Sequence, residues 1–125
     1  MGNVLTIKEL IEKKGIIEEK RNEFLLIDVN GLGTFKFRKP TSEEVETSYR
    51  QEKGGEELLI QTCSVEPNLA DLELRKEFGM EERENPIKIV KKIFNYGQIQ
   101  GIAGKLLESA GLKEEEVKVV DEIKN

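Results

Sequence analysis

The sequence predicts a small α+β domain that is mostly α-helical, with one N-terminal β-hairpin packed on a bundle of short helices. Two strand-like runs are joined by a glycine-containing turn, and amphipathic segments of helical spacing surround them. The length of 125 residues suits one domain. No internal repeat or low-complexity linker divides the chain. We therefore expect a single domain over residues 1–125, with residues 113–125 as a candidate flexible tail.

The first predicted helix runs from Thr6 to Lys14 and ends at Gly15. Thr6 and Glu9 have the spacing of a capping box, in which each side chain accepts a hydrogen bond from the other residue's backbone. One face of this helix is apolar and carries Ile7, Leu10 and Ile11. The charged segment 18–23 that follows is expected to be either an outer strand or a solvated loop.

Residues 24–29 and 34–38 are the predicted strands of the hairpin. The first run is apolar and of strand length, and the second alternates, with Phe35 and Phe37 on one face. The turn between them contains Gly31 and Gly33, which can adopt positive φ. Because an isolated hairpin is marginal in water, this one must pack on the helices or pair with another chain.

A corner motif is predicted in the middle of the chain. A second capping box, Thr41 to Glu44, opens an acidic helix, and Gly54-Gly55 separates this helix from the next. Pro67 should end that next helix, since proline lacks an N–H and restricts the residue before it. Asn68 should cap the following helix, which buries leucines and Phe78 and ends at Gly79. The motif, which sets the angle between the two helices, comprises Cys63, Glu66, Pro67, Asn68, Leu69 and Gly79.

Two more helices are predicted towards the C-terminus. Pro86 suits the first turn of one, which Tyr96-Gly97 ends or bends. Residues 98–110 form the last long helix, capped by Gly111. Glycines 97, 101 and 104 would permit close helix approach, at a propensity cost of roughly 1 kcal/mol for each interior glycine. Residues 113–125 suit a frayed helix, a short strand or a tail that orders on a partner.

The composition argues against several classes of function. The formal net charge is -5 and no basic face stands out, which disfavours nucleic-acid binding. No run approaches the roughly 20 apolar residues of a membrane span, and the first ten residues lack the pattern of a signal peptide. One cysteine excludes an intrachain disulfide. A cytoplasmic protein, neither secreted nor membrane-bound, is expected.

The sequence offers no convincing catalytic, cofactor or metal site. Histidine is absent, which removes the commonest general base and metal ligand. Gly104-Lys105 lacks the other positions of a phosphate-binding loop, and Gly31-Leu32-Gly33 lacks the third glycine of a dinucleotide motif. Adjacent glutamates are best interpreted as solvated charges. Cys63 is predicted to be buried and inert. We therefore expect a protein that is not an enzyme.

A longer pattern extends from Leu59 to Gly111. It comprises IQTCSVEPNLADLELRKEFG, then Pro86, Val90, Phe94, Gly97, Ile99, Ile102, Leu106, Ser109 and Gly111. This pattern resembles the tail assembly chaperones of contractile-tailed phages and defective prophages of Gram-positive bacteria. That family has a cysteine, then Glu-Pro-Asn-Leu, then a leucine-bearing helix that ends in glycine, followed by a proline-started helix and a Gly-Glu-Ile helix start. Gln98 departs from the family's glutamate.

The resemblance implies a non-enzymatic chaperone that binds the tape measure protein and keeps it soluble until tail tube subunits polymerise around it. The implied partners are the tape measure protein and, as a further candidate, the tail tube protein. Many copies on each client would favour self-association. The alternative is a structural tail component, such as a tube or connector subunit. The residues predicted to contact a partner, chosen because they have the weakest claim to the core, are Leu32, Val117, Val119, Val120 and Ile123.

Overall fold

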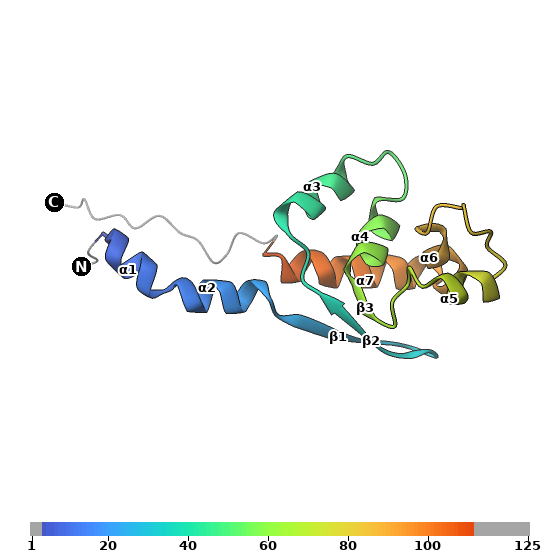
Figure 1. Ribbon diagram of the computed structural model, residues 1–125, viewed down its shortest axis with the longest axis horizontal. Helices are drawn as coiled ribbons and strands as arrows, with labels where there is room; N and C mark the ends of the chain where they lie inside the picture. Colours follow the sequence, from blue (N-terminus) through green and yellow to red (C-terminus); the bar gives the residue numbers. More distant parts are fainter. Residues whose placement is uncertain (1–3, 112–125) are drawn as a thin grey trace.

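The computed structural model describes residues 4–111 and has a mixed α+β architecture, in which helices cover one face of a small antiparallel sheet (Figure 1). Along the chain the elements are α1 (Ile7–Glu12), α2 (Lys14–Arg21), β1 (Phe24–Val29), β2 (Gly33–Arg38), α3 (Ser42–Tyr49), α4 (Gly55–Cys63), β3 (Ser64–Glu66), α5 (Leu72–Glu77), α6 (Lys88–Ile93) and α7 (Tyr96–Ser109).

The two predicted strands pair with each other. β1 and β2 are antiparallel, with Phe24 opposite Arg38 and Val29 opposite Gly33. A third strand, β3, was not predicted, and it pairs with the other edge of β2. The sheet order is therefore β1-β2-β3, which leaves β1 at an edge.

The core lies between the sheet and the helices α4, α6 and α7. Phe37 of β2 is fully buried, and Phe35 packs against Phe94 with 5.3 Å between the ring centroids. The alternation predicted for β2 thus directs both phenylalanines inward. The largest other side chains with almost no exposed surface are Leu59, Ile60, Leu69, Ile89, Val90 and Leu106.

The prediction for the first twenty residues was partly wrong. Gly15 does not end a helix but lies within α2, and the segment 18–23 is mainly helical rather than a strand or loop. The interruption falls at Lys13, whose backbone N–H bonds to Leu10 O before the helix resumes. One interior glycine costs only about 1 kcal/mol, and the helix-favouring lysines, glutamates and arginine around it outweigh that cost. The hairpin is consequently preceded by two helices.

The corner motif also differs from its prediction. α4 ends at Cys63, before Pro67, because residues 64–66 turn extended and pair with the free edge of β2. The Glu66–Pro67 peptide bond is cis. Asn68 is not the helix cap, since its side chain accepts only the Ala70 N–H two residues on. The cap is Asp71, which accepts the Leu74 N–H at 2.9 Å.

The apolar residues that follow the corner divide between core and surface. Leu69 is fully buried, and Leu74 is partly buried against the core. Leu72 and Phe78, which were predicted to face inward, are exposed. Gly79 ends α5 with φ +79°, as predicted, and this backbone conformation favours glycine.

The last helix starts earlier than predicted. Tyr96 and Gly97 are its first residues, because Asn95 caps it and forms a capping box with Gln98. Glutamine serves this position as well as the glutamate of the resembling family. The prediction of close helix approach at the α7 glycines was wrong. A Cβ at Gly101 or Gly104 would meet nothing within 4 Å.

Gly55 is the position where the backbones of α3 and α4 approach each other closely. A Cβ built there would lie 2.3 Å from the backbone oxygen of Ser48, whose buried hydroxyl donates to Gly55 O at 2.8 Å. α3 and α4 therefore meet at a point that admits no side chain.

We predict that Gly55→Ala destabilises the protein by about 1–3 kcal/mol, because the backbone of α3 must move away from the new methyl group. Gly101→Ala is the matched control and should stabilise by about 0.5–1 kcal/mol, because alanine favours the helix over glycine and its Cβ would meet nothing within 4 Å. Urea unfolding followed by circular dichroism measures both. Equal stabilities for the two variants would contradict the packing described at Gly55.

Candidate functional site

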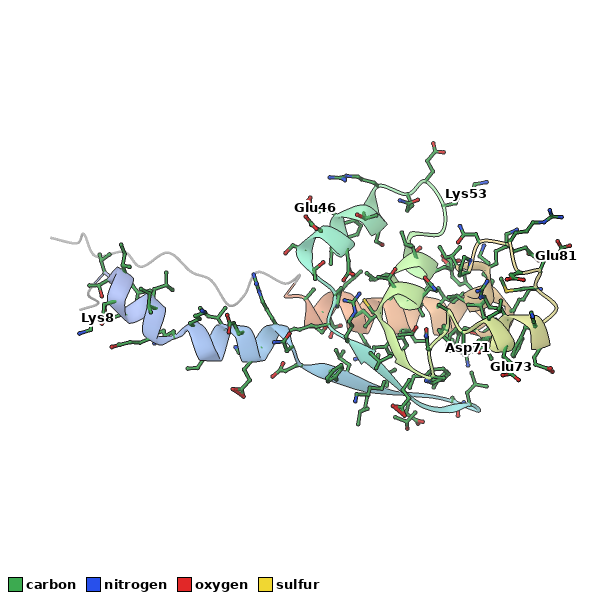
Figure 2. All side chains as sticks on the ribbon, viewed as in Figure 1. Lys8, Glu46, Lys53, Asp71, Glu73 and Glu81 are labelled. Atoms are coloured by element: carbon green, nitrogen blue, oxygen red, sulfur yellow. The ribbon has the colours of Figure 1, made fainter. Side chains whose placement is uncertain are left out.

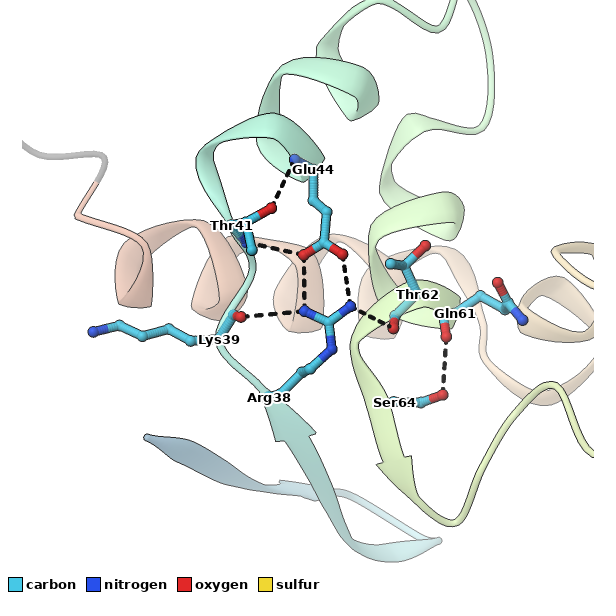
Figure 3. Close-up of polar contacts among 7 residues, drawn as sticks. All are labelled: Arg38, Lys39, Thr41, Glu44, Gln61, Thr62 and Ser64. Atoms are coloured by element: carbon cyan, nitrogen blue, oxygen red, sulfur yellow. Dashed lines mark hydrogen bonds and ion pairs between the residues drawn. The ribbon is translucent and has the colours of Figure 1, made fainter. Parts of the chain in front are cut away.

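The polar centre of the structure is an ion pair that joins β2 to α3 (Figure 3). Arg38 donates from Nη1 to Glu44 Oε1 at 2.8 Å and from Nη2 to Oε2 at 2.6 Å. Nη2 also donates to the backbone oxygen of Thr62 in α4, at 3.3 Å. Glu44 accepts the Thr41 N–H of its capping box at 2.9 Å. One arginine thus fixes a strand and two helices relative to each other.

The titration behaviour of this centre follows from the same contacts. The hydrogen bonds from Arg38 lower the pKa of the Glu44 carboxyl, against an opposing effect of partial burial. The hydrogen bond to Glu44 in turn raises the pKa of Arg38. Both groups remain charged at neutral pH, and the pair is structural rather than poised for proton transfer.

Cys63 lies close to this ion pair and is fully buried. Burial raises the pKa of its thiol to about 11, although the positive charge of Arg38 acts in the opposite direction. A thiol of such high pKa is a poor nucleophile at neutral pH. Cys63 was predicted to be buried, and it is. The sequence did not predict a cation beside it, because Arg38 lies 25 positions earlier in the chain.

The described residues contain no cluster of three or more acidic or cysteine side chains that could hold a metal ion. The surface grooves formed by the described residues are open to solvent and are lined by both polar and apolar side chains. The groove beside β1 has a volume of about 620 Å³ and is bordered by Leu25, Leu26, Ile27, Asp28, Lys105, Glu108 and Ser109. This lining combines apolar residues with the charged side chains of Asp28, Lys105 and Glu108.

The most unusual surface is the pair of helices α1 and α2, which we call the arm (residues 7–21). The arm extends away from residues 24–111, which we call the body, and neither helix contributes a buried residue (Figure 1). Figure 2 shows its side chains spread around the helices, with Lys8 near the far end. Ile7 is 79% exposed. The other large apolar side chains exposed on the arm are Leu10, Ile11, Ile16 and Ile17, and the exposed Val4 and Leu5 come just before its N-cap, Thr6.

The first helix of the arm, α1, has one apolar face. Within α1, Ile7, Leu10 and Ile11 are spaced at i, i+3 and i+4 and therefore share a face. Lys8 and Glu12 lie on a different, charged side of the helix. Scattered single exposed hydrophobic residues are normal, but a set concentrated on one projecting element is typical of an interaction site.

Sequence reasoning missed the arm as a contact surface. Amphipathic spacing and a capping box look the same in a helix that packs on its own domain and in one that binds a partner. Among the residues predicted for partner contact, Leu32 is 52% exposed in the hairpin turn. The others, Val117, Val119, Val120 and Ile123, lie outside the described residues.

The chain was compared with family models, curated proteins and solved structures. No family model, no curated protein and no solved structure matches it. Within residues 4–111, none of the helices has the length and apolar character needed to cross a membrane.

We predict that Glu44→Gln lowers the free energy of unfolding by about 1 kcal/mol at pH 7, because it removes the charge pair while glutamine retains the capping box. The folded-state pKa of Glu44 is lowered. The contribution is therefore complete above the ordinary carboxyl pKa and lost as the pH falls below about 4. Urea unfolding across this pH range measures it.

The matched control is Glu43→Gln, an exposed glutamate in the same first turn of α3. It should change stability by much less than Glu44→Gln at pH 7. A pH-independent difference between the two variants would show that the charge of Glu44 is not what stabilises the junction.

Proposed function

We propose that this protein is a non-enzymatic phage tail assembly chaperone that holds apolar helices of a tape measure protein in solution before tail tube subunits polymerise around it. The observation that carries the proposal is the exposed apolar face of the arm. The resemblance of residues 59–111 to tail assembly chaperones supplies the identity of the client. The location that this function implies is the cytoplasm of the bacterial host.

The arm suits an apolar helix as its client. Amphipathic helices recognise one another through residues at i, i+3 and i+4, which is the spacing of Ile7, Leu10 and Ile11. Removing one such side chain from water contributes about 1.5–3 kcal/mol. The capping box of Thr6 and Glu9 holds α1 helical before the client arrives, which lowers the entropy lost on binding.

The narrow apolar face also suits a temporary contact. Three or four side chains on one helix give a modest interface, well below the roughly 800 Å² per partner of stable complexes. Charged residues on a different side of α1, such as Lys8 and Glu12, would remain in contact with water in the complex. A tail tube subunit that binds the client over a larger area would displace such a chaperone.

The first experiment is co-expression with the tape measure protein encoded in the same genome, followed by affinity purification. We predict that the tape measure protein is soluble only in the presence of the wild-type chain and co-elutes with it. Ile7→Ser combined with Ile11→Ser should reduce the recovered complex at least tenfold, a loss of about 1.4 kcal/mol or more. The unfolding free energy should change little, since both side chains are exposed.

The matched control combines Lys8→Ser with Glu12→Ser, which changes two exposed residues on a different side of the same helix. It should bind the client as the wild type does. If the tape measure protein behaves identically without this chain, the chaperone proposal is wrong. The chain should then be sought in purified particles, where a structural tail component would be found and a chaperone would not.

A second variant tests the tail residues chosen from the sequence. Serine at Val117, Val119, Val120 and Ile123 should weaken client binding without unfolding the domain if these residues contact the client. Normal binding by this variant, together with loss of binding by the arm variant, would assign the contact to the arm alone.

A further inference from the structure

The outer edge of β1 lacks the features that normally protect an exposed strand. Within residues 4–111, β1 pairs only with β2, so its second edge carries no strand partner. Five of its six residues are apolar and the sixth is Asp28. The strand has no lysine, no proline and no bulge on this side, whereas natural edge strands usually carry at least one of these. Among the three described strands, the register shift lies between β2 and β3.

The groove beside this edge is lined in part by residues that also contact the hydrophobic core. Its β1 wall includes Leu25 and Ile27, which are partly buried and pack against the core. Its α7 wall carries Lys105, Glu108 and Ser109. A strand added at this edge would lay alternate side chains over the same core and place its other face beside exposed Leu26.

We propose that β1 pairs antiparallel with β1 of a second copy of this chain, so that two sheets join into one across a two-fold axis near Leu26. An antiparallel strand pair of this kind is isologous, because the same edge serves both copies. With Leu26 opposite its own counterpart, Leu25 of each copy faces Ile27 of the other on the core side of the joined sheet.

The charges at the groove support a second copy as the occupant. Lys105 and Glu108 are one helical turn apart on the same wall of the groove. A two-fold axis through the groove runs the two α7 helices antiparallel and brings Lys105 of each copy towards Glu108 of the other. The surface is thus complementary to itself in charge as well as in hydrogen bonding, and it needs no other partner chemistry.

The small area of the β1–β1 contact limits the affinity expected for the dimer. A six-residue strand is about 20 Å long, and pairing it with itself buries less than the roughly 800 Å² per partner of a stable complex. The dimer should therefore be weak and depend on concentration. This contact uses the edge of β1 and not the apolar face of α1, so it can exist whether or not the arm binds a client.

The test is light scattering after size exclusion, loaded from about 10 μM to about 1 mM, the range that weak interfaces span. The wild-type mass should rise from 14.3 kDa towards twice that value. Leu26→Lys should remain monomeric throughout, since lysine on an edge opposes pairing. Leu26 is 72% exposed, so the fold should tolerate the change.

The matched control is Tyr96→Lys, which adds the same charge at a side chain that is 78% exposed at the far end of α7. It should dimerise as the wild type does. Amide hydrogen exchange supplies the second measurement, in which protection of residues 24–29 should increase with concentration in the wild type and not in Leu26→Lys.

Three results would overturn the proposal. They are a monomer at every concentration, a dimer that Leu26→Lys leaves intact, and full protection of β1 in the monomer. The last result would mean that another part of the same chain covers the edge. None of these measurements involves the tape measure protein, so a failure here is distinguishable from a failure of the proposed chaperone function.

Discussion

The structure depends on burying one face of β2. Phe35 and Phe37 lie on the face of the sheet that packs against α4, α6 and α7. Phe94 packs against Phe35. Within residues 4–111, these helices cover only that face of the sheet, and the outer edge of β1 pairs with no further strand. The arm, which contributes nothing to the core, extends from the same strand. Packing in the body thus determines which apolar residues remain at the surface.

The sequence predicted the features that depend on neighbouring residues. The capping boxes at Thr6 and Thr41, the alternation in β2 and the glycine end of α5 involve groups within a few positions of each other. Two parts of the corner-motif prediction, the helix end at Pro67 and the cap at Asn68, were wrong because they depended on a distant partner. Residues 64–66 form a strand because they pair with the edge of β2. The residues near position 64 in the sequence do not indicate that this edge is available. Asp71 then displaced Asn68 as the cap.

The candidate contact surface was harder to predict for a related reason. Whether Ile7, Leu10 and Ile11 are buried depends on whether another element lies against them, and their spacing does not contain that information. Cys63 was easier, since a free cysteine beside apolar helix positions is usually buried. The ion pair of Arg38 and Glu44 also escaped prediction. It links residues six positions apart across the junction of a strand and a helix, so neither helical nor strand periodicity places them together.

The arm and the edge of β1 would reinforce each other if both proposals hold. A tape measure protein presents long apolar helices, so many copies of the chaperone would bind along one client through their arms. Copies held on one client have a high effective concentration, typically in the millimolar range for short tethers. An edge contact that is weak between free molecules would then be well populated along the client. Each contact would also be released singly, so a growing tail tube could remove the copies in sequence. Weakness in each interface is therefore what this function requires.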